Sequence, residues 1–223
     1  MAKSNTTRSA FLAMGVAMAF AAQSRAVPPP DAALLRELPA GSAVEARLDA
    51  DIDGDRIADV AFVGGDDEAR WLVVRMGRAG GAFAPAAAYR GLGHPLGPAS
   101  LAVKRQVLLV DDLTGGTTAT AATYRYRLDP ATQRLRLIGL DAERYSRTNS
   151  HDSLKASWNL LTGAFETVRG ILDDNPSSDD DAAYRYTTPE RTLRKSNPVY
   201  LEDTPDPDAL IDAEVVPPDE DRD

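Results

Sequence analysis

The stretch Tyr124–Leu140, with the sequence YRYRLDPATQRLRLIGL, decides the fold class of this chain. Tyrosines and leucines alternate with arginines on both sides of the central Asp129-Pro130 pair. Because successive side chains of a β-strand point to opposite faces, this alternation predicts two strands, each with one apolar and one basic face. An Asp-Pro pair is typical of a turn. The stretch is therefore predicted to form a β-hairpin.

Short strand-like segments separated by turn residues continue on both sides of this hairpin. A second hairpin is expected over Leu154–Val168, and a short helix over Asp31–Leu38. The further strands expected are Ala43–Leu48, Asp59–Val63, Trp71–Met76, Val107–Leu113, Thr117–Leu128 and Tyr184–Thr187. Since no helices alternate with these strands, a parallel sheet is not supported. Residues 40–201 are therefore predicted to form an all-β domain: a propeller, a barrel or, as the main alternative to a propeller, a β-sandwich.

The composition excludes several classes of protein. The chain has 223 residues, with 25 Lys and Arg against 34 Asp and Glu, and a net charge of −9. Nucleic acids and anionic membrane surfaces attract basic proteins, so neither is expected as a partner. The absence of cysteine excludes a disulfide framework, a thiolate zinc site, a cysteine nucleophile and a lipid-modified cysteine anchor.

Residues 1–26 have the features of a secretory signal peptide. A basic start is followed by the 13-residue apolar run Ala10–Ala22 and by small residues at Ser24 and Ala26. A helix needs about 20 apolar residues to span a bilayer, so an uncleaved membrane anchor is disfavoured. We expect cleavage before Val27, a soluble protein in the periplasm without a membrane anchor, and a linker with the short helix over residues 27–39.

Acidic charge is concentrated at the other end of the chain. Residues 202–223 (EDTPDPDALIDAEVVPPDEDRD) hold ten acidic residues and one arginine, whereas residues 27–201 hold 21 basic and 24 acidic residues. Segments with few apolar residues and a high net charge do not order themselves. The sequence therefore predicts a nearly neutral domain followed by a disordered acidic tail, with at most a short turn at Ala209–Val216.

Acidic residues at every second position form the most distinctive motif. The segment Asp49–Phe62 reads DADIDGDRIADVAF. Five carboxylates so close in sequence would repel one another without a cation. A glycine among them permits the chain to curl their oxygens around a hard cation such as Ca²⁺, which takes six to eight oxygen ligands. The predicted cofactor is a structural calcium ion, with the candidate ligands Asp49, Asp51, Asp53, Asp55 and Asp59.

Two registers compete for this loop. An EF-hand register begins at Asp49, but Val60 then stands where the bidentate glutamate belongs. The shorter register of calcium loops in β-propeller repeats begins at Asp51 and ends at Asp59, with Arg56 where a glycine is usual. The second register accounts for a strand directly after the loop, so it is favoured, with Asp49 as an auxiliary ligand.

The segment Gly54–Phe62 (GDRIADVAF) fits the pattern GDxxxDxxF. In this the chain resembles periplasmic immunity proteins, which protect bacteria against peptidoglycan-degrading effectors of type IV secretion systems. The resemblance implies a small, non-repetitive β-propeller of about five short blades with a calcium-bound acidic loop. It also implies tight inhibition of a cognate lysozyme-like effector. Many members are lipoproteins, and this chain departs from them because it has no cysteine to lipidate.

An inhibitor of this kind would block a cleft that contains catalytic carboxylates. Hydroxyl, amide or basic donors on a protruding loop, with an aromatic side chain beside them, would suit such a cleft. The loop 144–152 (RYSRTNSHD) combines these groups, and the segment 158–163 (WNLLTG) offers a hydroxyl at a turn. The candidate contact residues are Arg144, Tyr145, Arg147, Ser150, His151 and Thr162, in a monomer that binds its target one to one.

Three other functions stay open. A general inhibitor of host lysozymes would act by the same means. A calcium-dependent structural or adhesion module of the FG-GAP, integrin-like type usually carries several acidic loops, and only one is present. A hydrolase is disfavoured because neither His94 nor His151 has metal-ligand spacing, and the neighbours of His151, Ser150 and Asp152, rarely achieve triad geometry from one loop. We therefore expect no enzyme.

Overall fold

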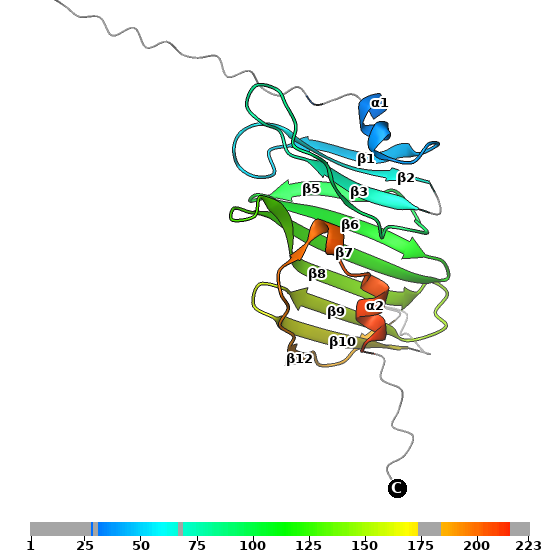
Figure 1. Cartoon of the computed structure of the whole chain (residues 1–223). Coiled ribbons are helices and arrows are strands. Elements are labelled where there is room, and N and C mark those ends of the chain that lie inside the picture. Colours follow the sequence, from blue (N-terminus) through cyan, green and yellow to red (C-terminus); the bar gives the residue numbers. More distant parts are fainter. Residues whose placement is uncertain (1–27, 29–30, 67–68, 174–183, 215–223) are drawn as a thin grey trace, which may run out of the picture.

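The computed structural model describes residue 28 and residues 31–66, 69–173 and 184–214. Two open antiparallel sheets account for nearly all of its regular structure (Figure 1), so the prediction of an all-β fold is confirmed. The smaller sheet has the order β1-β2-β3-β4 and comprises β1 Ala43–Ala50, β2 Asp59–Gly65, β3 Arg70–Arg75 and β4 Ala87–Tyr89. The larger sheet has the order β11-β10-β9-β8-β7-β6-β5, with β12 paired to β10 and β13 paired to β8.

The larger sheet is built from β5 Ser100–Lys104, β6 Val107–Gly115, β7 Thr118–Asp129, β8 Arg134–Ser146, β9 Ser153–Asn159, β10 Ala164–Leu172, β11 Tyr184–Tyr186, β12 Glu190–Leu193 and β13 Val199–Tyr200. The short helical segments are α1 Asp31–Leu34, η1 Leu35–Glu37, η2 Leu201–Asp203 and α2 Pro207–Asp212. The predicted strands and the short N-terminal helix are thus present, with small shifts of their ends.

Strands β7 and β8 form the predicted hairpin, and a β-bulge shifts their pairing register by one residue. Tyr124 pairs with Leu140 and Tyr126 with Leu137, which leaves Ile138 as an extra residue on β8. The extra residue lets Leu137 and Leu140 point to the same buried face although they are three positions apart. The alternation of buried and exposed side chains along β8 is therefore interrupted at Ile138.

The outer edge of β10 is covered in two pieces. β12 pairs with Ala164–Thr167 and β11 pairs with Gly170–Leu172, both antiparallel. The edge strands that face outward are thus only four and three residues long.

Both sheets contribute to one main core. Val63 and Leu72 of the smaller sheet and Leu108 and Tyr124 of the larger sheet belong to the same cluster of buried apolar residues. The opposite face of the smaller sheet forms a second cluster, in which Phe62, Val60 and Val73 pack with Leu34 and Leu38 of the N-terminal helical segment. Leu34 and Leu38 therefore cover that face of the smaller sheet.

The prediction that the tail is disordered from residue 202 onward is wrong for residues 202–214. The C-terminal segment, drawn from orange to red in Figure 1, lies across one face of the larger sheet. Leu201, Leu210 and Ile211 are buried in the main core, and the hydroxyl groups of Tyr126 and Thr204 lie 2.9 Å apart. These few apolar residues pack on the hydrophobic face of the larger sheet and order the segment. The average composition of the tail does not show this, because ten of the residues from 202 to 223 are acidic. Residues 215–223 lie outside the described part.

Neither sheet closes on itself among the described strands, and the radial blades of a propeller are not shown. The predicted signal peptide, residues 1–26, also lies outside the described part of the chain. Among the residues that the structure describes, no helix is long and apolar enough to cross a bilayer.

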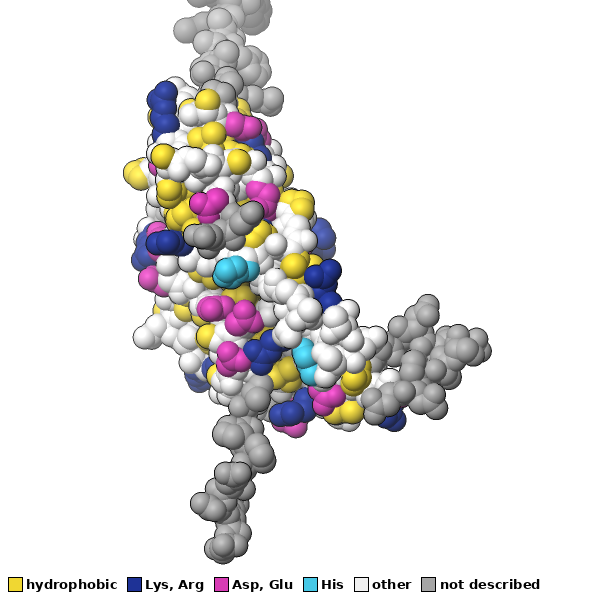
Figure 2. All heavy atoms as spheres, turned by 90° about the vertical axis from the view of Figure 1, so that its right-hand side faces the viewer, with side chains coloured by type: hydrophobic (Ala, Val, Ile, Leu, Met, Phe, Trp, Pro, Cys, Tyr) yellow, Lys and Arg dark blue, Asp and Glu magenta, His cyan; other side chains and the backbone are white. Residues whose placement is uncertain are grey.

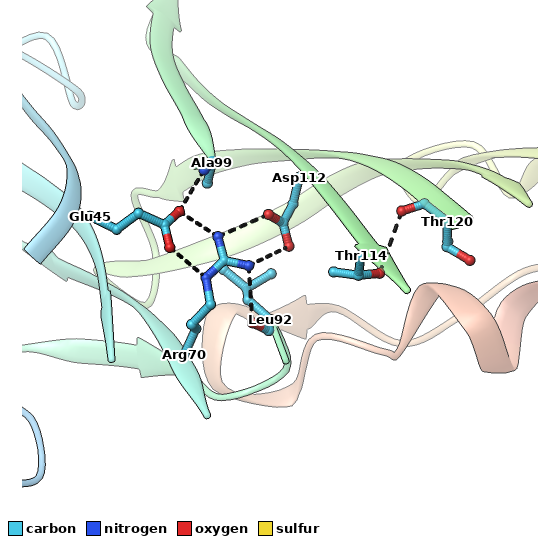
Figure 3. A network of polar contacts seen from close by, with 7 residues as sticks. All are labelled: Glu45, Arg70, Leu92, Ala99, Asp112, Thr114 and Thr120. Atoms are coloured by element: carbon cyan, nitrogen blue, oxygen red, sulfur yellow. Dashed lines mark hydrogen bonds and ion pairs between the residues drawn. The ribbon is translucent and has the colours of Figure 1, made fainter. Parts of the chain in front are cut away.

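A buried guanidinium joins the two sheets. Arg70 of β3 lies between Glu45 of β1 and Asp112 of β6 (Figure 3). It donates to both oxygens of Glu45 at 2.7 and 2.5 Å, and to both oxygens of Asp112 at 3.1 and 3.3 Å. It also donates to the carbonyl oxygen of Leu92 at 3.1 Å, and Glu45 accepts the amide of Ala99 at 2.6 Å. Burial raises the pKa of Asp112 although Arg70 opposes this shift.

Candidate metal centre and binding surface

The acidic loop between β1 and β2 is shaped by its own carboxylates. Asp51 accepts the backbone N–H of Gly54 at 2.6 Å and that of Arg56 at 3.0 Å, which curls the chain around the Asp51 side chain. Gly54 has a φ of +91° and Arg56 a φ of +69°. Both are left-handed conformations, so Arg56 adopts glycine-like geometry where propeller loops carry glycine. A side chain at Gly54 would also collide with Gln106, since a Cβ there would lie 2.6 Å from the Gln106 amide nitrogen.

Three carboxylates converge in this loop. Asp51, Asp53 and Asp59 each offer one oxygen, and these oxygens all lie within 4.8 Å of one another. Two ligands of one calcium ion, each about 2.3–2.6 Å from it, lie no more than about 5 Å apart. The three oxygens therefore fit a shared hard cation and would supply about half of the ligands that calcium takes.

Asp59 is the most constrained of the three. It is fully buried at the start of β2, and its two oxygens accept the backbone N–H groups of Ile52 and Gly77 at 2.7 and 2.8 Å. Burial raises the pKa of Asp59 to about 6, and the nearby Asp53 and Asp55 add to the rise. Burial also raises the pKa of Asp53. A bound cation would stabilise the charged form of both side chains.

The two other candidate ligands lie outside this group. Asp49 receives two hydrogen bonds from Arg47, at 2.9 and 3.0 Å, so its carboxylate is engaged in an ion pair. Asp55 accepts the backbone N–H of Ile57 at 2.7 Å. The geometry thus favours the register that begins at Asp51, with three of its four carboxylates together and without Asp49.

The candidate contact residues do not form one surface. Tyr145 lines a groove on one face of the larger sheet, whereas Arg144 forms an ion pair with Asp212 of α2 on the other face. Arg147 is exposed and donates to the carbonyl oxygen of Gly116 at 3.3 Å.

Thr162 lies apart from the rest of these residues. It occupies the turn between β9 and β10, where its hydroxyl accepts the backbone N–H of Ala164 at 3.2 Å. The loop after β8 is at the opposite end of β9, a seven-residue strand that spans roughly 20 Å at about 3.3 Å per residue. A single partner loop would not reach both ends.

Ser150, His151 and Asp152 do not assemble a catalytic triad. The ring nitrogens of His151 lie 2.6 Å from the backbone oxygen of Asp152 and 2.9 Å from the hydroxyl of Thr118. The carboxylate of Asp152 instead accepts the amide of Leu172 at 2.8 Å, and the Ser150 hydroxyl lies 3.0 Å from that of Ser146.

Figure 2 views the molecule from the right-hand side of Figure 1. Both histidines lie on this face, with acidic side chains between them. A hollow of about 300 Å³ lies nearby, lined in part by His94, Asp206 and Asp208. Asp208 accepts a hydrogen bond from Thr120 at 2.5 Å, which fixes the start of α2 on β7. Asp208 thus helps to hold the C-terminal segment on the sheet.

The larger sheet also carries a groove that was not predicted from the sequence. It has a volume of about 690 Å³ and lies on the face of the larger sheet opposite the C-terminal segment. Its lining residues come mainly from five strands, β6 to β10, and the acidic ones are Asp111, Asp112, Asp141, Glu143 and Glu166. Asp111 and Asp112 lie on β6, Asp141 and Glu143 on β8, and Glu166 on β10, and the antiparallel pairing of these consecutive strands brings them together.

Comparisons with protein-family models, with curated proteins and with solved structures gave no match for this chain.

Proposed function

We propose that this chain is a secreted, calcium-stabilised immunity protein that binds a lysozyme-like peptidoglycan hydrolase in the periplasm and blocks its cleft. The observation that supports the proposal best is how the GDxxxDxxF segment is built into the fold. Gly54 has a positive φ, Asp59 belongs to the three-carboxylate group, and Phe62 is buried beneath the N-terminal helical segment. These signature positions therefore each have a physical reason for their residue type.

A structural calcium ion suits such a binding protein. The ion would connect the loop before β2 to the start of that strand, because Asp51 and Asp53 belong to the loop and Asp59 to the strand. A scaffold that is already rigid loses less conformational entropy when it binds, which favours tight inhibition. The propeller of about five blades that the resemblance implies stays a prediction, as does the monomeric state.

The test is a wall-lysis assay with purified components. The mature protein, residues 27–223, is mixed with the lysozyme-like effectors of the organism's own type IV secretion system, and the clearing of a peptidoglycan suspension is followed by turbidity. We expect lysis by one effector to stop at a one-to-one ratio. Full lysis by every such effector in the presence of excess protein would overturn the proposal.

Two comparisons separate the rival functions. Hen-type lysozyme is assayed in parallel, and inhibition of that enzyme alone would favour a general lysozyme inhibitor. A calcium-dependent adhesion module would leave lysis by both kinds of enzyme unchanged. Protein incubated alone with peptidoglycan serves as the control for hydrolase activity of its own.

A further inference from the structure

The β7–β8 hairpin extends past the strands on either side of it. Pairing of β7 with β6 ends at Leu108 and Tyr126, and pairing of β8 with β9 ends at Gly139. The two hairpin strands stay paired with each other as far as Asp129 and Arg134. Among the described strands, the two-residue β13 is the neighbour of β8 in this part. The hairpin therefore has a narrow end that projects past its neighbours.

Contacts to Tyr200 of β13 hold the projecting end in place. Asp129 accepts the hydroxyl of Tyr200 at 3.1 Å and the backbone N–H of Ala131 at 2.9 Å. The guanidinium of Arg134 lies 4.0 Å from the centroid of the Tyr200 ring and pairs with Glu202 at 3.2 Å. A surface that is ordered before binding loses less conformational entropy in a complex. The hairpin end is thus suited to act as a rigid contact element.

Two arginines stand opposite each other on this end. Arg127 of β7 pairs with Arg136 of β8, next to the pair of Tyr126 and Leu137. Because Tyr126 and Leu137 are buried in the core, the two arginines point to the other face of the sheet. Like charges directly opposite on neighbouring strands destabilise a sheet. An anion bound to the two guanidinium groups would remove this repulsion.

No carboxylate among the described residues forms an ion pair with either of these arginines. The other arginines of the hairpin are compensated, since Arg125 pairs with Asp141 at 2.6 Å and Arg134 pairs with Glu202. The Nε atom of Arg136 is buried, and within the described part of the chain it has no hydrogen-bond partner. A buried donor without an acceptor is unfavourable, so this group is poised for an acceptor from outside.

Lys104 extends the two arginines into a row. It pairs with Val107, which lies one position beyond the pair of Leu108 and Tyr126 and therefore beside Arg127. Neighbouring strands are about 4.8 Å apart, so the backbone of Lys104 is roughly 10 Å from that of Arg127. Lys104 also has no ion pair with a described residue. We call Lys104, Arg127 and Arg136 the basic row.

Two acids on the same face do not compensate the basic row. Asp141 pairs with Arg125 and accepts the hydroxyl of Ser157 at 2.7 Å. Asp129 accepts the Tyr200 hydroxyl and a backbone N–H of its own turn. The row thus carries three positive charges without an ion pair, in a chain whose net charge is −9. Carboxylates of a partner would be repelled by the acidic remainder of the surface and attracted to this end.

The spacing of the two arginines matches that of a pair of catalytic carboxylates. Side chains directly opposite on antiparallel strands have Cβ atoms about 4.5–5.5 Å apart. The two carboxyl groups of a glycoside hydrolase are about 5–9.5 Å apart, on either side of the bond that they cleave. Arginine binds a carboxylate through two parallel N–H···O bonds, which fixes both distance and direction. Arg127 and Arg136 can therefore engage one carboxylate each.

We infer that the projecting end of the β7–β8 hairpin enters an acidic cleft of a partner protein, where Arg127 and Arg136 each bind one carboxylate. That the cleft belongs to the peptidoglycan hydrolase rests on the proposed function. Lys104, two strands away, contacts the margin of the cleft. The loop 144–152 begins near the opposite end of β8 and stays outside the cleft.

Charge-neutral variants test the hairpin against a matched control. The hairpin variant is Arg127→Gln with Arg136→Gln. The control is Arg36→Gln with Lys195→Gln, which removes the same charge at two exposed positions outside the basic row. Inhibition of the hydrolase is measured by the turbidity of a peptidoglycan suspension. We expect the hairpin variant to inhibit at least about tenfold more weakly and the control to stay within about twofold. Equal inhibition by both variants would overturn the inference while leaving the proposed function standing.

A charge reversal separates binding from folding. Arg127→Glu places a carboxylate opposite Arg136, so the cross-strand repulsion becomes an attraction. The melting temperature of the free protein should stay the same or rise, whereas inhibition should weaken about a hundredfold. Affinity and stability then change independently, which a variant that merely disturbs the fold would not show. Wild-type inhibition by this variant would contradict the inference.

A partner-independent probe covers the case in which the wild-type protein inhibits no hydrolase and the proposed function fails. The Nε–Hε signals of the arginines are then followed by NMR during titration with hexaglutamate. Shift changes confined to Arg127 and Arg136 support the inference, and changes that include Arg36 to the same extent overturn it. The acidic segment 215–223 of this chain is the competing occupant. If a chain that ends at Glu214 shows shifted Arg127 and Arg136 signals without any ligand, that segment occupies the row and the inference fails.

Discussion

At the scale of single residues, Asp59 is the most buried of the three carboxylates of the candidate metal centre. Replacing it by asparagine keeps its shape and removes the charge that a cation would bind. The asparagine NH2 cannot accept one of the two backbone N–H groups that Asp59 accepts, so the variant should also melt at a lower temperature than the wild type without calcium. We expect calcium to raise the melting temperature of the wild-type protein, since a ligand at a hundred times its Kd adds about 2.7 kcal/mol to the free energy of unfolding. The Asp59→Asn variant should melt at the same temperature with calcium and with chelator.

The matched control for this prediction is Asp49→Asn. Because Asp49 is paired with Arg47 and lies outside the three-carboxylate group, its variant should keep the calcium-dependent rise. Differential scanning calorimetry measures both proteins. If Asp59→Asn shifts with calcium as the wild type does, the metal centre is not where we describe it.

Arg70 is the second residue whose loss should be costly. Its side chain is 1% exposed, and so is that of Asp112. Arg70→Met would leave Asp112 buried without its cation, and breaking a buried pair in this way costs about 3–5 kcal/mol of unfolding free energy. Urea denaturation measures the loss. Arg191→Met removes an arginine that is 75% exposed from its pair with Glu166, and should cost at most about 1 kcal/mol.

A second variant distinguishes the ion pair from simple packing. Adding Asp112→Leu to Arg70→Met removes the uncompensated charge, so the double variant should recover part of the lost stability. A double variant that is less stable than Arg70→Met by the full cost of a second core substitution would show that charge compensation is not the cause.

At the scale of helices and strands, sequence patterns predicted the structures that depend on residues close together in the chain. The alternation around Asp129-Pro130 predicted the hairpin of β7 and β8, and the spacing of the acids predicted the loop that brings Asp51, Asp53 and Asp59 together. The ordered structure of residues 202–214 was not predicted, because a segment with few apolar residues becomes ordered only by packing on another part of the protein. Here that part is the larger sheet. The groove was missed because it depends on which side chains of five successive strands are small, and the Arg70 network was missed because it joins β1, β3 and β6, which are far apart in sequence.

The C-terminal segment carries a prediction of its own. Ile211 of α2 is fully buried, and truncating a buried isoleucine to alanine costs about 2–5 kcal/mol. We expect Ile211→Ala to lower the urea midpoint accordingly. Asp212→Ala, at an exposed neighbour in the same helix, should change the free energy of unfolding by less than about 1 kcal/mol. Equal effects of the two substitutions would mean that α2 does not pack on the sheet as described.

At the scale of the whole molecule, the shared core and the Arg70 contacts predict that the two sheets unfold together. The chain has two tryptophans, Trp71 on β3 of the smaller sheet and Trp158 on β9 of the larger one. The variants Trp71→Phe and Trp158→Phe therefore each leave one fluorescent reporter in a known sheet. Midpoints from fluorescence should agree with the midpoint from circular dichroism in each variant, as for a two-state transition. Separate midpoints for the two reporters would show that the sheets unfold independently.

The divided cover of β10 has a consequence for how this protein behaves at high concentration. A long bare strand at the margin of a nine-stranded sheet would offer a continuous row of amides and carbonyls, on which other chains can add and grow into fibres. Here that margin is broken into runs of three and four residues. Neither run offers the six or seven residues in register that a steric zipper requires, so this margin of the sheet is a poor template for the addition of further strands.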